Sequence, residues 1–186
     1  MQKIVVGVMG ASETDALTAA AKAEARSLAE RLGAALARAG VVLVTGATTG
    51  LPNLIATAYH AHGGALVLGI SPAANRDEHA ERYRLPAEAA DVIVYTGFGL
   101  KGRNVINVRT ADIVVIFGGA TGTLNEFTIA YDEGKIIGVL EGSGGIADHI
   151  GEIVNFCKKP CSGAVLFDRD PDVLLERCLT ALDDRR

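Results

Sequence analysis

Short apolar runs alternate with longer segments along nearly the whole chain, and this alternation is the feature that most limits the fold. The first run, KIVVGVM (Lys3–Met9), is rich in β-branched residues, which is typical of a buried strand. Six further runs follow at Val41–Gly46, Ala65–Ser71, Asp91–Gly97, 112–119, 135–142 and 163–170. Strands that are apolar throughout predict a parallel sheet covered on both faces.

The segments between these runs predict the connecting helices. Apolar residues recur every three or four positions in the first of them, at Ala21, Ala25, Leu28, Leu32, Ala35 and Ala39. Helices are also expected near 51–62, 101–110, 122–133, 146–156 and 171–182. Right-handed crossovers make such a sheet doubly wound. We therefore predict an α/β fold with a doubly wound, mainly parallel sheet of about seven strands, a Rossmann-like three-layer sandwich.

Size and composition limit the class of protein. At 186 residues, without a linker or composition break, the chain suits one domain over 1–186. A net charge of -4 offers no basic excess for nucleic acid or anionic membranes, so we expect neither partner. No apolar run reaches the roughly 18–20 residues of a membrane span, and no signal peptide opens the chain. Three cysteines suit a reducing compartment, so a cytoplasmic location is expected.

No metal site is expected from the spacing of the potential ligands. Cys157 and Cys161 form a single C-x3-C pair with no second pair or nearby histidine, and the four histidines are scattered. The chain also has no G-x-S-x-G elbow and no G-x-x-x-x-G-K-[ST] loop, which disfavours a serine hydrolase and a P-loop NTPase.

Four of the connections that follow strands are rich in glycine and small hydroxyl residues: GVMGASET, VTGATTG, YTGFGLKGR and FGGATGT. In a doubly wound sheet these connections share the carboxyl edge, where ligands bind near the point at which strand order reverses. The sequence therefore predicts a nucleotide-binding edge that includes Gly10, Ser12, Gly46, Gly97 and Gly99.

The last of these turns predicts a phosphate site. Gly118, Gly119 and Gly122 let the backbone approach a ligand closely, and Thr121 and Thr123 supply hydroxyl donors. The helix that follows adds free N–H groups and the positive end of its dipole. The alternative is that the threonines only cap this helix.

Two charged residues are candidates for the chemistry. Glu126 lies one turn after Gly122, on the face of the helix start, so its carboxylate should face the group to which the phosphate is attached. Arg103 opens the preceding helix and could clamp a phosphate. The alternatives are a solvated Glu126 and a surface Arg103.

Two further segments leave alternatives open. GFGLKG (97–102) matches the dinucleotide pattern G-x-G-x-x-G, but it follows the fourth strand, and Asp112 opens the next strand rather than closing it. A dinucleotide-dependent oxidoreductase is therefore the weakest candidate. The charged segment Pro72–Ala90 has no clear period, and it is either a lid or a solvated connection.

The motif GRNVINVRTADIVVIFGGATGTLNE resembles the Lonely Guy superfamily, whose members often carry a lysine decarboxylase label, and its molybdenum-cofactor carrier branch. The segment GAALARAGVVLVTGATTGLPNLIATAYHAHGGALVLGISP is similar to the first half of the family, so the resemblance spans about 3–150. It implies homodimers or larger assemblies and no required cofactor.

The resemblance implies two functions. Lonely Guy enzymes hydrolyse the N-glycosidic bond of cytokinin nucleoside 5′-monophosphates, and their catalytic residues match Arg103 and Glu126. Their phosphate-binding residues match Gly118, Gly119, Gly122 and Thr123. The carrier branch instead binds a phosphate-bearing pterin cofactor. The ligand would thus be a nucleotide monophosphate or a molybdopterin-type molecule, and the protein an enzyme or a non-catalytic carrier or sensor.

Two departures bear on this choice. Phe117 replaces the proline that usually precedes the glycine pair of the enzymes, and Asn104 replaces a lysine after the arginine. Both weaken the inference of cytokinin activation and leave that of phosphate binding intact. A carboxylate beside the ribose could stabilise an oxocarbenium-like state, but no general acid for the leaving base is identified.

Overall fold

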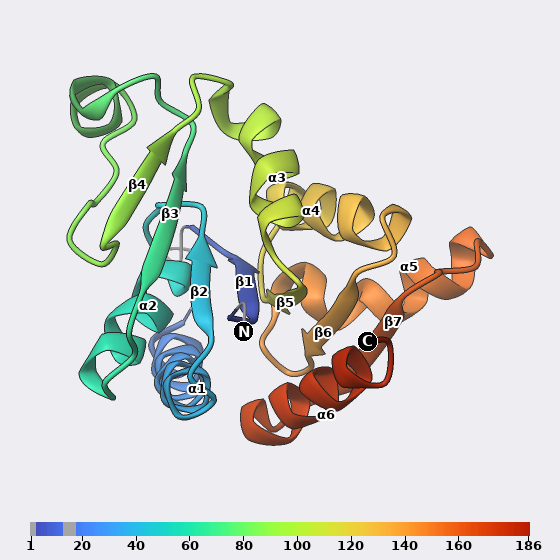
Figure 1. Ribbon diagram of the computed structural model, residues 1–186. Coiled ribbons are helices and arrows are strands. Elements are labelled where there is room, and N and C mark those ends of the chain that lie inside the picture. The colour runs from blue at the N-terminus through green and yellow to red at the C-terminus, as the bar shows by residue number, and fades with distance from the viewer. Residues whose placement is uncertain (1–2, 13–17) are drawn as a thin grey trace.

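The computed structural model describes residues 3–12 and 18–186, which contain one sheet of seven strands (Figure 1). The strands are β1 (Val5–Gly10), β2 (Val42–Thr45), β3 (Val67–Ser71), β4 (Val92–Tyr95), β5 (Ile113–Phe117), β6 (Ile136–Leu140) and β7 (Ala164–Asp168). Their order is β4-β3-β2-β1-β5-β6-β7, and every neighbouring pair is parallel. The prediction of a doubly wound parallel sheet is confirmed.

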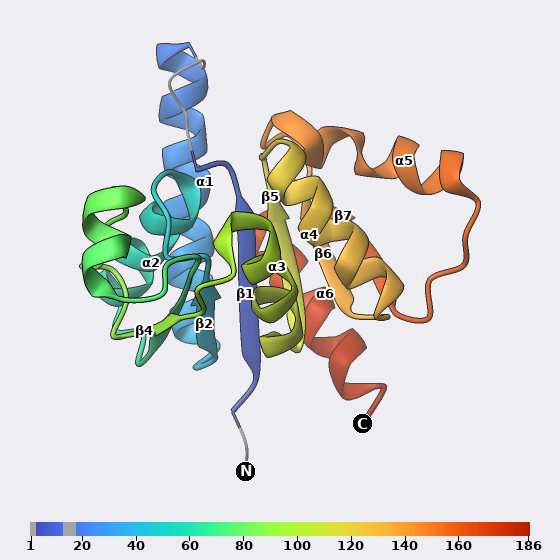
Figure 2. The ribbon, with the colours of Figure 1, turned by 90° about the horizontal axis from the view of Figure 1, so that it is seen from above.

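Six α-helices of the described residues cover the two faces of the sheet (Figures 1 and 2). One face carries α1 (Ala19–Arg38), α2 (Leu51–Ala61) and α6 (Pro171–Asp183), and the other carries α3 (Gly99–Thr110), α4 (Thr121–Asp132) and α5 (Ile150–Cys157). A short 3-10 turn, η2 (Gly145–His149), precedes α5, so the helix expected near 146–156 is divided. Along β5, Val115 and Phe117 pack under the first set of helices, whereas Val114 and Ile116 pack under the second.

The edge strand β4 departs from the expected coverage on both faces. Val92 and Val94, which share one face of the strand, remain 48% and 43% exposed, because no α-helix of the described residues covers that face of β4. An apolar run in sequence does not distinguish an edge strand from a central one, since strand order alone decides which strands have two neighbours.

The segment Pro72–Ala90 is ordered around one buried histidine. It contains a short π-helical turn, η1 (Glu78–Arg82), within which His79 is 1% exposed. The Nδ1 atom of His79 lies 2.9 Å from Oγ of Ser71 at the end of β3, and its Nε2 lies 3.2 Å from the carbonyl oxygen of Pro86. These contacts fix the segment to the end of β3.

Strand order reverses between β1 and β5, which are neighbours although about a hundred residues separate them. The chain reaches β5 from the edge strand β4 through α3, which passes back across the sheet (Figure 1). Asp112 lies at the amino end of β5, where its Oδ2 accepts a hydrogen bond of 2.8 Å from the N–H of Val5. This places Asp112 at the edge of the sheet opposite the carboxyl ends of the strands.

No helix in the described ranges is long and apolar enough to cross a bilayer.

The close packing of α1 on α2 gives a test of the fold. A Cβ on Gly33 would lie 2.6 Å from Cβ of Ala58 and 2.8 Å from the carbonyl oxygen of Ile55. We predict that Gly33→Ala lowers the free energy of unfolding, because overpacking costs about 1–3 kcal/mol and alanine's helix propensity returns at most about 1 kcal/mol. Urea denaturation would measure the difference.

The matched control is Gly151→Ala in α5, where the added Cβ would meet only Phe167, at 3.9 Å. That variant should be as stable as the wild type or slightly more stable. Equal stability of Gly33→Ala and Gly151→Ala would contradict the packing argument.

Candidate functional site

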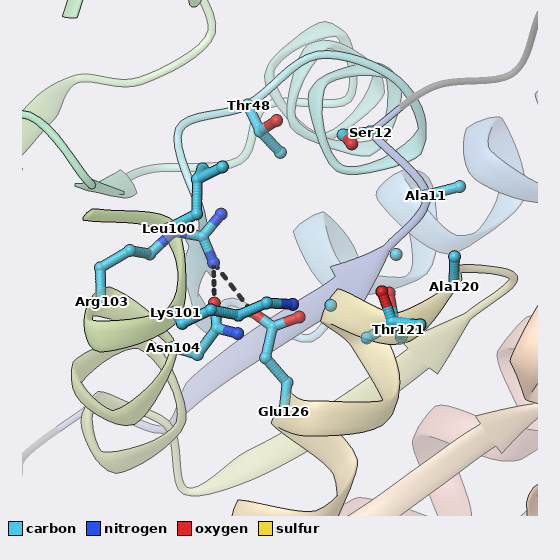
Figure 3. A pocket seen from close by; sticks show the side chains of 13 residues that line it. Ala11, Ser12, Thr48, Leu100, Lys101, Arg103, Asn104, Ala120, Thr121 and Glu126 are labelled. Atoms are coloured by element: carbon cyan, nitrogen blue, oxygen red, sulfur yellow. Dashed lines mark hydrogen bonds and ion pairs between the residues drawn. The ribbon is translucent and has the colours of Figure 1, made fainter. Parts of the chain in front are cut away.

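A cavity of about 360 Å³ opens at the carboxyl edge where strand order reverses (Figure 3). Its walls come from the ends of β1 and β2 and from the first turns of α3 and α4. The lining residues are Gly10, Ala11, Ser12, Thr48, Leu100, Lys101, Arg103, Asn104, Ala120, Thr121, Gly122, Thr123 and Glu126. No residue of the segment Pro72–Ala90 lines the cavity.

The predicted glycines divide into two groups. Gly10 lines the cavity, as does Ser12, and Gly46 lies directly behind Arg103. Gly97 and Gly99 do not line it, because they form the turn into α3, where both have positive φ (68° and 66°).

Gly118 and Gly119 also lie outside the lining and shape the turn before α4. Gly118 has a φ of 59° and Gly119 a φ of 90°. A Cβ on Gly119 would lie 2.2 Å from Oγ1 of Thr123, so only glycine allows this threonine to pack beneath the turn. The two glycines therefore hold the turn in shape rather than line the cavity.

The start of α4 presents free donors to the cavity. Its N-cap residue is Ala120, and no side chain of the described residues caps it. The threonines therefore do not cap this helix, in contrast to the alternative considered from the sequence. Within the same residues, the N–H groups of Thr121, Gly122 and Thr123 have no hydrogen-bond acceptor. Unpaired N–H groups at the positive end of a helix dipole favour an anion.

Lys101 adds a positive charge at this helix start. A Cβ on Gly122 would lie 3.7 Å from Nζ of Lys101, and the ammonium makes no ion pair with any described residue. Sequence reasoning missed this residue, because it lies inside the segment interpreted as G-x-G-x-x-G. Its position two residues before Arg103, at the start of the same helix, is the signal that could have identified it.

Arg103 and Glu126 form a buried ion pair beneath the cavity (Figure 3). Nη1 of Arg103 donates to Oε1 of Glu126 at 2.9 Å and to Oδ1 of Asn104 at 2.7 Å. The side chains are 9% and 7% exposed, so neither the surface Arg103 nor the solvated Glu126 occurs. A Cβ on Gly46 would lie 2.1 Å from Nη2 of Arg103, so glycine is required at the end of β2 to seat the guanidinium.

A second donor reaches the same carboxylate oxygen. Nδ2 of Asn107 lies 3.1 Å from Oε1 of Glu126 and 3.0 Å from Sδ of Met9. Asn107 is 1% exposed, and within the described part of the chain neither its Oδ1 nor Nε of Arg103 has a hydrogen-bond partner. Sequence reasoning missed Asn107, although polar residues at 103, 104 and 107 share one buried face of α3.

The pKa of Glu126 is raised above the ordinary value for a glutamate. Burial is the main cause, because it disfavours the charged carboxylate. The charge of Arg103 and the hydrogen bonds from Asn107 and Arg103 act in the opposite direction, as does the more distant charge of Lys101. Glu126 therefore holds its proton to higher pH than an exposed glutamate does.

Comparison with known proteins places this geometry in a family. The model of the SLOG cluster4 family matches residues 3–175. The chain belongs to the SLOG cluster4 family. An uncharacterized protein of Archaeoglobus fulgidus is 32% identical over 163 residues, covering 84% of this chain and 96% of the relative.

Two solved structures have the same fold as this SLOG cluster4 chain. The protein TM1055 is 26% identical with a TM-score of 0.81, covering 95% of this chain and 99% of its own. The molybdenum cofactor binding protein of the phototrophic bacterium Rippkaea orientalis is 26% identical with a TM-score of 0.75, covering 97% and 98%. The suspected membership of the Lonely Guy superfamily, near its molybdenum-cofactor carrier branch, is confirmed.

The raised pKa of Glu126 predicts how the stability of the SLOG cluster4 chain depends on pH. The folded protein binds this proton more tightly than the unfolded chain does, so the free energy of unfolding falls as pH rises from the ordinary glutamate pKa to the raised one. Glutamine at 126 does not titrate. We therefore predict that the melting temperature of Glu126→Gln, minus that of the wild type, increases from pH 4 to pH 8. A difference that stays constant over this range would contradict the prediction.

Proposed function

We propose that the cavity binds the phosphate group of a nucleotide-like monophosphate ester. The single observation that carries the proposal is the start of α4, where three N–H groups and the ammonium of Lys101 converge, none of them paired with another described residue. Thr121 and Gly122 line the cavity at the same place. A doubly charged phosphate suits such a site, since its oxygens accept hydrogen bonds and its charge meets a cation and a helix dipole.

The rest of the cavity would hold the body of the ligand. A volume of about 360 Å³ is within the range of small-ligand pockets. With the phosphate at α4, the attached sugar or pterin would lie over Arg103 and Glu126, toward the small residues at the end of β1, Gly10 and Ala11.

Hydrolysis of an N-glycosidic bond is the first candidate for chemistry, and the free carboxylate oxygen of Glu126 favours it. The donors on Arg103 and Asn107 both reach Oε1, while Oε2 has no partner among the described residues and points away from Arg103 (Figure 3). In the proposed reaction, the bond between base and ribose breaks and water adds to the anomeric carbon. The products are the free base and ribose 5-phosphate, and the carboxylate stabilises the cationic transition state.

Binding without chemistry is the second candidate. The structure of a molybdenum cofactor binding protein supports it, because it shares this fold over nearly the whole chain at 26% identity. The site also holds one buried carboxylate rather than a pair, and Phe117 and Asn104 depart from the pattern of the enzymes. A carrier or sensor would use the same phosphate contacts and leave the ligand intact.

We also propose that the protein pairs with a second copy through β4 and the start of α3. Val92, Val94, Phe98 and Leu100 are all exposed and apolar, with Phe98 at 67%. Large exposed side chains of this kind, close together in sequence, favour an interaction surface. Leu100 also lines the cavity, so a second copy on this surface would narrow the entrance of the cavity.

The three unpaired cysteines suit the cytoplasm as the site of action.

Incubation with AMP tests the proposed function. We expect AMP to stabilise the protein against heat, because a ligand that binds only the folded state raises its stability. If the protein is a hydrolase, chromatography will detect adenine and ribose 5-phosphate, and Glu126→Gln will lower their release by about 100-fold or more. Stabilisation without release would favour a carrier, and stabilisation by NAD alone would favour a dinucleotide enzyme.

Lysine variants test the phosphate contact in the same assay. Lys101→Gln should weaken AMP binding about tenfold, since a hydrogen bond to a charged group contributes about 1.5–3 kcal/mol. Lys3→Gln makes the same change before β1, at the opposite edge of the sheet, and should have no effect. If adenosine binds as tightly as AMP, the phosphate site is wrong.

Exposed phenylalanines provide a matched pair for the proposed dimer. Phe98→Ser should weaken association about 100-fold, because a twofold interface loses two buried side chains at about 1.5 kcal/mol each. Phe156→Ser changes a phenylalanine near the end of α5 that is even more exposed, at 87%, and should leave association unchanged. Light scattering on a size-exclusion column would measure both. A monomeric wild type, or dissociation caused by Phe156→Ser alone, would contradict the proposed surface.

A further inference from the structure

We propose that Asn107 is a positioning residue: with Arg103 it holds Oε1 of Glu126, so that Oε2 is the oxygen that meets the ligand and carries the proton when Glu126 is neutral. The contact with a ligand rests on the proposed function, whereas the placement of the proton does not. Both donors reach the same atom of Glu126, although Nη1 of Arg103 also donates to Oδ1 of Asn104 and Nδ2 of Asn107 also lies near Sδ of Met9.

Arg103 and Asn107 approach Oε1 from one face of α3. They are four residues apart in this helix, which places their side chains on the same side, facing α4. Their donors lie 2.9 Å and 3.1 Å from Oε1. Because Glu126 belongs to α4, the two bonds fix its carboxyl group relative to both helices.

The orientation of the Asn107 amide is determined by its surroundings. If the amide were turned over, Oδ1 would face the carboxylate oxygen, and the two acceptors would repel each other. With Glu126 ionised, Nδ2 therefore faces the carboxylate, and Oδ1 remains buried without a partner among the described residues. An apolar side chain of similar shape would avoid this unpaired carbonyl. Holding the carboxylate accounts for an asparagine at this position.

This arrangement decides which oxygen is protonated. A neutral carboxyl group carries one hydrogen, and a hydrogen on Oε1 would meet the two N–H donors directed at that atom. The hydrogen therefore lies on Oε2, on the cavity side. Ionised Glu126 accepts a hydrogen bond there, for which a sugar hydroxyl is suited, and neutral Glu126 donates one to the same ligand region.

Asn107 also shifts the balance between these two forms. Its N–H group stabilises the ionised carboxylate, so its loss should favour the neutral form. The charged groups that face Glu126 from the described residues are Arg103 and Lys101, both on α3. On β1, the neighbour of Asn107 is Met9, which does not titrate.

An NMR titration of the whole protein tests this role without any ligand. With 13C at the glutamate carboxyl carbons, the resonance missing from Glu126→Gln identifies Glu126. We expect Asn107→Leu to raise its pKa by about one unit, the size of a shift that one lost hydrogen bond to a charged group produces. Asn107→Ala is a second variant in case Asn107→Leu does not fold, and it should also raise the pKa of Glu126. Asn155→Leu, an exposed asparagine on α5, is the control and should leave the titration unchanged.

The same pKa of Glu126 in the wild type and in both Asn107 variants would overturn the proposal. A lower melting temperature with an unchanged pKa of Glu126 would make Asn107 merely structural.

AMP binding, measured between pH 5 and 9, then tests the ligand contact. The pH at which the affinity for AMP changes should be higher in Asn107→Leu than in the wild type. Adding Asn107→Leu to Glu126→Gln should leave the pH dependence of AMP binding unchanged. If AMP does not bind at all, the proposed function fails while the titration still decides the role of Asn107.

Discussion

The buried ion pair of Arg103 and Glu126 joins α3 to α4 beneath the cavity, and so connects the two helices whose first turns line it. Removing one partner of such a pair costs about 3–5 kcal/mol, because the remaining charge stays buried and unpaired. Replacing both with apolar residues is often neutral or stabilising. Stability alone therefore does not account for the pair. The pair lies at the floor of a cavity, where Nε of Arg103 and Oδ1 of Asn107 have no partner among the described residues, and this position agrees with the proposed role in binding.

The pair can form because the backbone leaves room for it at two points. α3 returns from the edge strand β4 to the centre of the sheet, which brings Arg103 over the end of β2. Gly46 then provides the space that the guanidinium occupies, and Gly119 provides the space for Thr123. These two glycines act through the volume they leave free. Their role differs from that of Gly97 and Gly99, whose positive φ values turn the chain into α3.

Most of the fold could be predicted from sequence, because apolar runs and helical stripes depend on local periodicity. The cavity edge was predictable for the same reason, since parallel strands bring their following turns together. The exposure of Val92 and Val94 was not, because strand order is a property of the whole sheet. Nor were the contacts of Lys101 and Asn107: a helical period shows which face a side chain shares, but not which of two carboxylate oxygens it reaches.

The electrostatics of the site connect anion binding to the proton on Glu126. The chain has a net charge of -4, yet the cavity collects Lys101, Arg103 and the positive end of α4 around one carboxylate. A bound phosphate would bring two negative charges near that carboxylate and so favour its neutral form. The proton would then lie on Oε2, directed at the ligand. Under the proposed function, neutral Glu126 would donate this proton to the leaving base, and the carboxylate that it becomes would stabilise the cationic transition state. This gives Glu126 both roles, since no second acid is found among the described residues of the cavity.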